Sequence, residues 1–375
     1  LQECMVPHWV RGGQDKAEIV IINKKKSNRP LDVLALGNSM GSGGTVTAEV
    51  LAVADFEELE KRKEEVKGKI VYYNQGFDPT NVKPFVSYGQ TGIYRRSGPS
   101  RAAKYGAVGV MIRSLTESTA NDPHTGGMAY MDSFPKIPAI AVGPRDADAV
   151  WALSKQSSFT LSMTTHGSFL PDAVDHNVIA ELKGSEFPNE YITIGGHLDS
   201  WDVNEGAHDD GAGVVHTIEV MRALRAIGYQ PKHTLRFVLF ANEENGLRGG
   251  SKYAEVAKEK GEKHLFALES DAGGFTPRGF SIQANKEQMA KLQSWLPLLT
   301  QYGTSEITPD GGGADIGPLN RTFGTPVGEL FPDPQRYFDL HHARSDVFEN
   351  VHKRELLLGA VNMAALIYLV DKYGL

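Results

Sequence analysis

The sequence Gly195-Gly196-His197-Leu198-Asp199-Ser200 is followed a few residues later by His208-Asp209-Asp210-Gly211-Ala212-Gly213. An apolar run stops just before His197, and helical periodicity begins just after Asp209. An imidazole and a carboxylate therefore lie a dozen residues apart, one at the end of an expected strand and one at the start of the next helix. These residue types in these places are typical of a metal site.

The composition limits the kinds of protein that this chain can be. With 375 residues it exceeds the usual length of one domain, so we expect two domains or one large domain with an insertion. A net charge of -7 gives no bias toward nucleic acid, which we exclude as a partner. Cys4 is the only cysteine, so a metal would have to be held by histidines and carboxylates.

No apolar run approaches the length of a membrane-spanning helix, and we expect no membrane partner. The chain does not begin with Met, which leaves room for an export signal that has been removed.

The pattern of expected strands and helices changes near residue 175. The part before it contains several short apolar runs that predict strands, at residues 19–22, 33–36, 46–53, 68–74, 106–112 and 138–142. After it, expected strands at residues 177–182, 191–196, 235–241 and 265–269 alternate with helical patterns such as 213–227. Such alternation predicts an α/β fold with a mainly parallel sheet covered by helices on both faces, and sites at the carboxyl ends of its strands.

The first half of the chain offers no cluster with metal-ligand spacing. We expect residues 74–95 to form a long loop, and His124 to lie isolated in a turn with a structural role.

Three apolar runs stop directly before an acid or an imidazole. The first ends at His197, the second is followed by Glu243 and Glu244, and the third by Asp271. Together with Asp209 and one histidine of the pair at 341 and 342, they offer two imidazoles and three carboxylates as ligands. This set matches a pair of zinc ions that share one bridging carboxylate and each bind one histidine and one further carboxylate. Of the adjacent acids Glu243 and Glu244, one can ligate while the other acts as a base.

Several motifs together resemble the co-catalytic zinc exopeptidases, which include bacterial secreted aminopeptidases. They occur in the family's order and spacing across residues 175–375: Gly196-His197-Leu198-Asp199-Ser200, Gly206-Ala207-His208-Asp209-Asp210-Gly211-Ala212-Gly213, Glu243-Glu244-Asn245-Gly246-Leu247, Glu269-Ser270-Asp271-Ala272-Gly273 and His342-Ala343-Arg344-Ser345-Asp346. The resemblance implies a mixed, mainly parallel sheet flanked by helices.

A second resemblance covers residues 33–165, where Gly68-Lys69-Ile70-Val71 and Gly106-Ala107-Val108-Gly109 are similar to the protease-associated domain that is often inserted in these enzymes. It implies a β-rich domain at 33–165, inserted in a zinc peptidase domain made of residues 1–32 and 166–375.

The family pattern assigns roles residue by residue. His197 and Asp271 would hold one zinc ion, Glu244 and His342 the other, and Asp209 would bridge them. Glu243 would be the general base. His342 is chosen over His341 because it fits the spacing His-x-x-x-Asp with Asp346.

The resemblance also implies roles around the ligands. Asp199 would orient His197, and Asp346 would do the same for His342. The peptide bond between Asp209 and Asp210 is cis in relatives. His208 occupies a variable position, so we interpret it as lining the site or as solvated. We expect the remaining histidines to be structural, namely His166, His176, His216, His233, His264 and His352.

The resemblance implies a metal-dependent exopeptidase that hydrolyses terminal bonds of dipeptides or short peptides, through a zinc-bridged water with Glu243 as base. Aminopeptidase or dipeptidase action is favoured. The alternatives are a single-zinc glutaminyl cyclase of the same fold and a non-catalytic, receptor-like ectodomain. The relatives further imply a homodimer and an exported location, extracellular or periplasmic.

Overall fold

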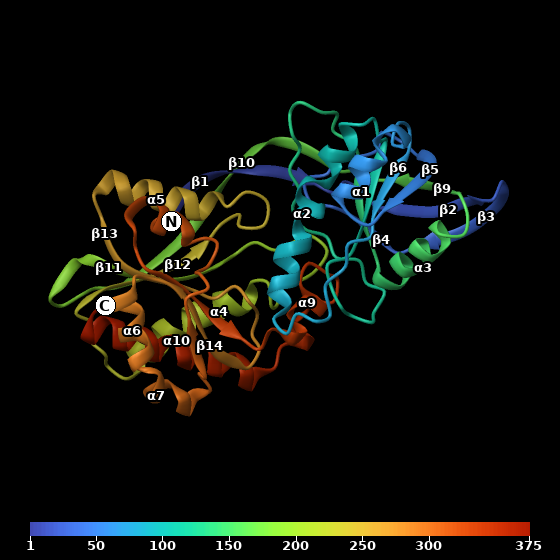
Figure 1. Cartoon of the computed structure of the whole chain (residues 1–375). Helices are drawn as coiled ribbons and strands as arrows, with labels where there is room; N and C mark the ends of the chain where they lie inside the picture. Colours follow the sequence, from blue (N-terminus) through green and yellow to red (C-terminus); the bar gives the residue numbers. More distant parts are fainter.

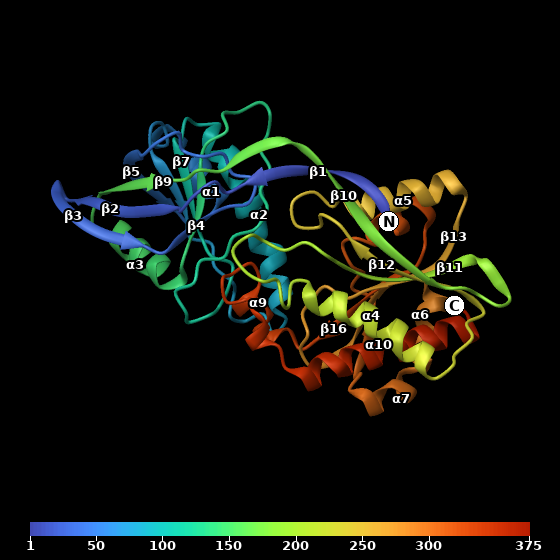
Figure 2. The same cartoon turned by 180° about the vertical axis from the view of Figure 1, so that it is seen from behind.

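The computed structural model describes all 375 residues as two lobes, each built on its own eight-stranded sheet (Figure 1). The main lobe contains both termini and the second half of the chain. The other lobe, called the inserted unit below, comprises residues 16–164. Figure 2 shows the two long strands, β1 and β10, that run side by side from one lobe to the other.

The sheet of the main lobe has the order β1-β10-β12-β11-β13-β16-β14-β15. Its strands are β1 (Gln2–Val10), β10 (Ser168–Leu182), β11 (Phe187–His197), β12 (His233–Phe240), β13 (Lys263–Glu269), β14 (Pro277–Gln283), β15 (Glu306–Thr308) and β16 (Val327–Pro332). The four central strands, β12, β11, β13 and β16, are parallel. Strand β10 pairs antiparallel with β1 and β12, and β14 pairs antiparallel with β16 and parallel with β15. The predicted α/β fold with a mixed sheet, parallel at its centre, is therefore confirmed.

Helices cover both faces of this sheet because its central strands are apolar on both sides. In β12, Leu235 and Phe237 enter one core with residues of α4, α6, α7 and α10, while Val238 and Phe240 enter a second core with α5 and α8. These helices are α4 (Gly211–Ala226), α5 (Arg248–Lys260), α6 (Lys286–Ser294), α7 (Leu296–Leu299), α8 (Gly317–Phe323) and α10 (Lys353–Tyr373). Short helical turns complete the lobe: η2 (Thr300–Tyr302), η3 (Pro334–Arg336), α9 (Tyr337–Leu340) and η4 (Phe348–Asn350).

Helix α10 is long and apolar enough to cross a membrane by length and composition, so the expectation that no segment approaches this length is wrong. Half of the most apolar stretch of this helix is buried inside the protein. Its residues Met363, Leu366 and Ile367 are fully buried in the core shared with α4 and the sheet. In this structure α10 is therefore a core helix.

The inserted unit is β-rich, as predicted. Its sheet has the order β3-β2-β9-β5-β6-β7-β8-β4. The strands are β2 (Lys16–Ile22), β3 (Lys25–Leu31), β4 (Val33–Ala35), β5 (Val46–Val53), β6 (Ile70–Tyr73), β7 (Gly109–Arg113), β8 (Ala139–Val142) and β9 (Phe159–Thr164). The helices are α1 (Phe56–Lys61), η1 (Lys63–Glu65), α2 (Pro84–Ala103) and α3 (Pro144–Ser154).

The predicted domain boundary between residues 32 and 33 is wrong. Strands β2 and β3 belong to the sheet of the inserted unit, where β2 pairs with both β3 and β9. Ile19 of β2 is fully buried beside Leu161 of β9, so β2 forms part of the core of this unit. The chain therefore passes from the main lobe to the inserted unit along β1 (Gln2–Val10) and returns along β10 (Ser168–Leu182).

The loop expected at residues 74–95 is also wrong in its second half, since α2 begins at Pro84. The proline stands in the first turn, where its missing N–H costs nothing. Further along this helix, Gly98 allows close packing, because a Cβ there would lie 3.0 Å from the ring of Tyr73. This helix reaches the main lobe, where the ring of Phe85 stacks on Tyr337 of α9 at 5.4 Å.

Candidate metal centre

The five predicted ligands meet at the carboxyl ends of the central strands. His197 is the last residue of β11, Glu244 follows β12 and Asp271 follows β13. Asp209 precedes α4, and His342 follows α9. Because β11, β12 and β13 are parallel, their ends lie at one edge of the sheet, which brings His197, Glu244 and Asp271 together although they are up to 74 positions apart in the chain.

The carboxylate of Asp209 lies between two histidines and turns one oxygen to each. Its Oδ1 is 3.3 Å from Nε2 of His197, and its Oδ2 is 3.3 Å from Nε2 of His342. Each histidine has a second acid beside the same nitrogen: Asp271 Oδ1 at 3.2 Å from His197 and Glu244 Oε2 at 3.0 Å from His342. The five side chains thus form two three-membered groups that share Asp209.

These separations fit two divalent ions. Zinc binds nitrogen and oxygen at about 2.0–2.1 Å in a tetrahedral arrangement, which places two ligand atoms of one ion about 3.3 Å apart. Oδ2 of Asp209 and Oε1 of Glu244 are buried without any hydrogen-bond partner, which is costly for a carboxylate unless a cation neutralises it. The residues therefore fit the metal pair that the sequence predicted.

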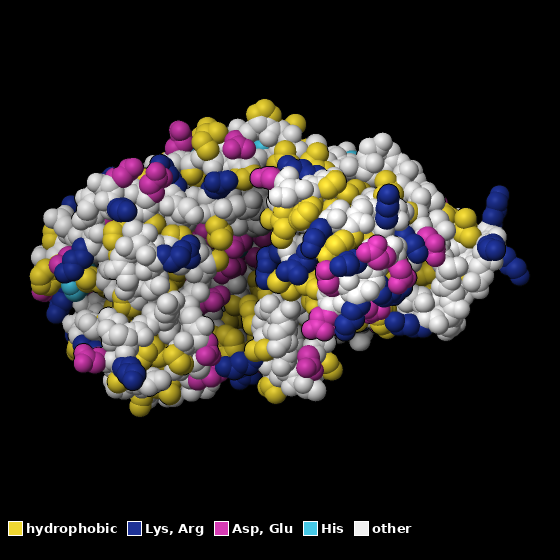
Figure 3. All heavy atoms as spheres, turned by 45° about the horizontal axis from the view of Figure 1, so that its top comes forward, with side chains coloured by type: hydrophobic (Ala, Val, Ile, Leu, Met, Phe, Trp, Pro, Cys, Tyr) yellow, Lys and Arg dark blue, Asp and Glu magenta, His cyan; other side chains and the backbone are white.

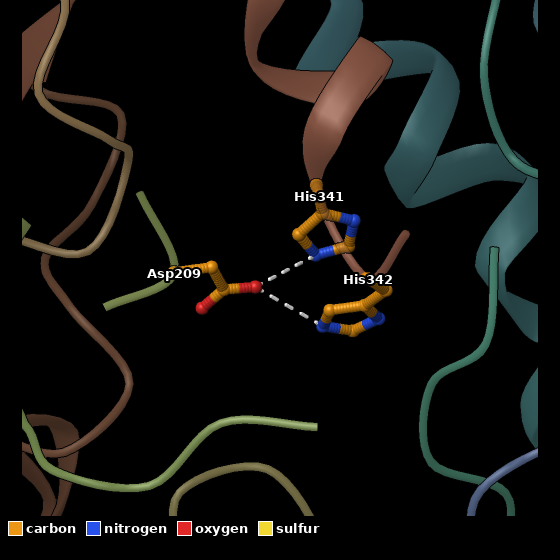
Figure 4. Close-up of side chains that lie close together, drawn as sticks. All are labelled: Asp209, His341 and His342. Carbon is orange, nitrogen blue, oxygen red and sulfur yellow. Dashed lines mark ion pairs between the residues drawn. The ribbon is translucent and has the colours of Figure 1, made fainter. Parts of the chain in front are cut away.

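Both neighbouring histidines approach Asp209, but they differ in their other contacts. Nε2 of His341 lies 3.7 Å from Oδ2 of Asp209, and its ring stacks on that of His342 at 3.5 Å (Figure 4). Only His342 also contacts Glu244. The geometry therefore favours His342 as the ligand and places His341 along the wall of the site.

Asp199 contacts Glu243 and Glu244 as well as His197, the one ligand that we expected it to orient. Its carbonyl oxygen accepts a hydrogen bond from Nδ1 of His197 at 2.8 Å, so it does orient that ring. Its carboxylate accepts the backbone N–H groups of Glu243 at 2.8 Å and Glu244 at 3.1 Å. Asp199 thus positions His197 together with both adjacent acids.

The role expected for Asp346 is wrong. Its fully buried carboxylate accepts the backbone N–H groups of His208 at 2.8 Å and Asp209 at 3.1 Å, and makes no hydrogen bond to His342. Asp346 therefore supports the shared carboxylate, which sequence spacing alone could not reveal. The peptide bond between Asp209 and Asp210 is cis, as the resemblance implied.

Two further histidines differ from expectation. His208 is buried, with its ring stacked on Phe275 at 4.3 Å, so a solvated position is wrong. His124 is not isolated, because its Nδ1 lies 2.7 Å from the carbonyl oxygen of His341. The sequence could not reveal this contact because it joins residues of different lobes.

Comparison with known proteins agrees with the geometry. The sequence profile of peptidase family M28 matches residues 177–367. Carboxypeptidase Q of Mus musculus is 34% identical over 372 residues, which cover 99% of this chain and 76% of the relative. The chain belongs to peptidase family M28.

Solved structures support the same placement. The structure of a peptidase M28 precursor from Shewanella amazonensis superposes with a TM-score of 0.93 at 30% identity, covering 100% of this chain and 84% of the other. A zinc aminopeptidase from Bacillus subtilis shares the fold, with a TM-score of 0.67 at 19% identity over 99% of this chain and 84% of the other. This M28 chain is thus a peptidase with the fold of metallo-exopeptidases.

A cavity of about 650 Å³ opens between the lobes of this M28 peptidase and is lined by the candidate metal ligands. Figure 3 shows the hollow, with acidic side chains along its floor and basic ones on the wall of the inserted unit. The main lobe contributes Asp209, Glu243, Glu244, Asp271, Glu329, Tyr337, His341, His342 and the glycine loop at 312–313. The inserted unit contributes Phe85, Tyr88, Arg95 and Arg96 from α2. The two lobes therefore build the M28 site jointly.

The acids of this site are crowded and poorly solvated. Burial raises the pKa of Glu243 to about 8 and the pKa values of Glu244 and Asp271 to about 7, and neighbouring carboxylates add to these shifts. Two divalent cations would reverse this effect, since they favour the ionised form of each acid.

We predict that the metal-free protein loses stability as the pH rises from about 5.5 to about 8. In this window the folded state keeps protons on Glu243, Glu244 and Asp271 that the unfolded chain has already released, so the free energy of unfolding falls with rising pH. His197 and His342 act in the same direction, because nearby carboxylates hold their pKa values well above 6.5 despite burial.

Urea unfolding of chelator-treated protein at both pH values measures this change in the free energy of unfolding. Adding zinc should restore the stability that is lost at the higher pH. A metal-free unfolding midpoint that increases with pH would contradict the prediction.

Proposed function

We propose that this protein is a di-zinc exopeptidase in which His197 and Asp271 hold one ion, His342 and Glu244 hold the other, and Asp209 bridges them. The observation that supports this assignment is the position of Asp209, whose two oxygens face different histidines at 3.3 Å. Zinc is favoured because the ligands are imidazoles and carboxylates whose paired atoms lie 3.0–3.3 Å apart, and because a structural neighbour is a zinc aminopeptidase. Two zinc ions would supply Lewis-acid activation of a water molecule and of the scissile carbonyl.

Glu243 is the general base in this proposal. Its backbone N–H is fixed by Asp199, while its side chain lines the cavity and makes no hydrogen bond or ion pair with the protein. It can therefore accept the proton of the attacking water and deliver it to the nitrogen of the leaving amine. The adjacent Glu244 is directed toward His342 and cannot share this task.

The charges of the cavity support a small substrate with free ends. Arg95 is only 5% exposed, and its guanidinium has no carboxylate partner. Glu329 also lines the cavity and has no cationic partner, and its pKa is raised well above its usual value by burial and by the nearby carboxylates of Asp271 and Glu269. A buried charge without a partner is costly, so each favours a ligand of opposite charge.

The distances suit a dipeptide. Nη1 of Arg95 lies 3.4 Å from Nδ1 of His342, so one imidazole ring separates it from the metal position. One extended residue spans about 3.5 Å, which allows Arg95 to receive a carboxylate one residue beyond the scissile carbonyl. Glu329 and Asp271 would then face the free amino group. We therefore favour dipeptidase action, with aminopeptidase action on short peptides as the broader form.

The two other candidate functions fit less well. A single-zinc glutaminyl cyclase would need only one half of the ligand set. A non-catalytic module would need no general base, the role that Glu243 fits. Export and dimer formation stay predictions that rest on the resemblance, as does the identification of the inserted unit with a protease-associated domain.

We predict that Glu243→Gln lowers kcat for dipeptides by about 10²–10⁴-fold, because the amide cannot accept a proton. Zinc content, measured by elemental analysis, should stay at two ions per chain, since Glu243 is not a ligand in this proposal. Glu186→Gln, at an exposed position away from the site, is the matched control. Full activity of Glu243→Gln, or well under one zinc per chain in the unmodified protein, would refute the proposed function.

We predict that Arg95→Gln lowers kcat/KM for dipeptides with a free carboxyl end by about 10–100-fold, the usual range for losing a charged hydrogen bond. The same dipeptides with an amidated end should be affected much less. Arg101→Gln on the exposed side of the same helix is the control. If the unmodified enzyme cleaves free and amidated dipeptides equally well, Arg95 does not bind the terminal carboxylate of the substrate.

A further inference from the structure

The inserted unit holds the backbone around His342. The N–H of Thr125 donates to the carbonyl oxygen of His342 at 2.9 Å. Nδ1 of His124 lies 2.7 Å from the carbonyl oxygen of His341, and because that partner can only accept, Nδ1 must carry the hydrogen. Two successive carbonyl groups at the metal centre are thus fixed by two successive residues of the other lobe.

The segment that makes these contacts is itself anchored in the inserted unit. The N–H of His124 donates to Oγ of Ser114, just after β7, at 3.0 Å. Oγ1 of Thr125 donates to the carbonyl oxygen of Ala35, at the end of β4, at 2.8 Å. The donors of His124 and Thr125 are therefore placed by two strands of the inserted unit.

His342 needs such support because of its backbone. Its φ of +62° lies in the left-handed region that favours glycine. Its ring also lies directly against Gly126, where a Cβ would come within 2.5 Å of Nδ1. Two residues further along, Arg344 forms ion pairs with Asp32 and Asp122 of the inserted unit, at 3.0 and 3.3 Å. Contacts from the other lobe thus support the conformation that directs His342 toward Asp209, together with the hydrogen bond that Nδ2 of Asn204 in the main lobe donates to the carbonyl oxygen of Ala343.

The hydrogen bonds that hold His197 and the backbone beside Asp271, in the other half of the metal centre, come from the main lobe. Nδ1 of His197 bonds the carbonyl oxygen of Asp199, and its N–H bonds the carboxylate of Asp210. Beside Asp271, the N–H of Ser270 donates to the carbonyl oxygen of Gly195. All of these partners belong to the main lobe.

From this asymmetry we infer that His124 and Thr125 of the inserted unit are positioning residues for the His342 half of the metal centre, so that docking of the inserted unit and metal binding at His342 are coupled. The inference rests on the proposed di-zinc function. It means that the two metal positions differ in affinity for a reason that lies in the other lobe. Because coupling is reciprocal, an ion bound at His342 also strengthens the contact between the lobes.

The test is a zinc titration of the metal-free protein by calorimetry, comparing the unmodified chain with His124→Leu and His124→Asn. Leucine removes the donor, whereas the amide nitrogen of asparagine can take the place of Nδ1. We expect His124→Leu to weaken one of two zinc-binding steps by about 10–100-fold, the usual effect of losing a hydrogen bond that orients a ligand, and to leave the other step within about twofold. His124→Asn should recover most of the loss, and His166→Leu at an exposed position is the control.

A merely structural role for His124 would lower the unfolding midpoint and weaken both zinc-binding steps alike, or neither, and either result would overturn the inference. If the unmodified protein binds fewer than two zinc ions, the proposed function fails as well, so the two failures are distinguishable.

Should His124→Leu fail to fold, the unmodified protein still decides the question by hydrogen exchange of the Thr125 amide at zero, one and two equivalents of zinc. We expect protection of this amide to increase at only one of the two additions. Protection that is independent of zinc would overturn the inference.

Discussion

The carboxylate of Asp209 is the group on which the arrangement of this site depends. It is nearly fully buried, and its two oxygens face histidines that are 145 residues apart in the chain, His197 and His342. The backbone N–H of Asp209 is held by Asp346, and the neighbouring side chain of Asp210 caps α4 and binds the N–H of His197. The shared carboxylate is thus fixed from both sides before any metal is considered.

Around Asp209, the burial of several acids favours the binding of positive charge. Glu243, Glu244 and Asp271 gather within one cavity, where their mutual repulsion and poor solvation disfavour ionisation. We expect the same crowding both to destabilise the metal-free site at neutral pH and to favour the binding of cations, because bound cations would relieve the repulsion. Stability and function are linked here through one group of acids.

The sequence predicted the parts of this site that follow from local pattern. Apolar runs that stop before His197, Glu244 and Asp271 place these residues at strand ends, and the parallel arrangement of the strands then brings them together. Local pattern could not reveal contacts between distant segments. The boundary near residue 33 was misplaced because β2 is defined by its pairing with β9. The start of α2 was missed because its first turn packs through Phe85 on Tyr337, which lies far away in the chain. The roles of Asp346, His124 and Arg95 were missed or mistaken because each depends on a partner far away in the chain.

The most direct test of the account is a diffraction experiment on crystals of the zinc-loaded protein, recorded at the zinc absorption edge. The account predicts two anomalous peaks per chain, about 3.5–4 Å apart, one beside each oxygen of Asp209, with His197 and Asp271 at one peak and His342 and Glu244 at the other. A single peak, or two peaks that do not share Asp209, would contradict it.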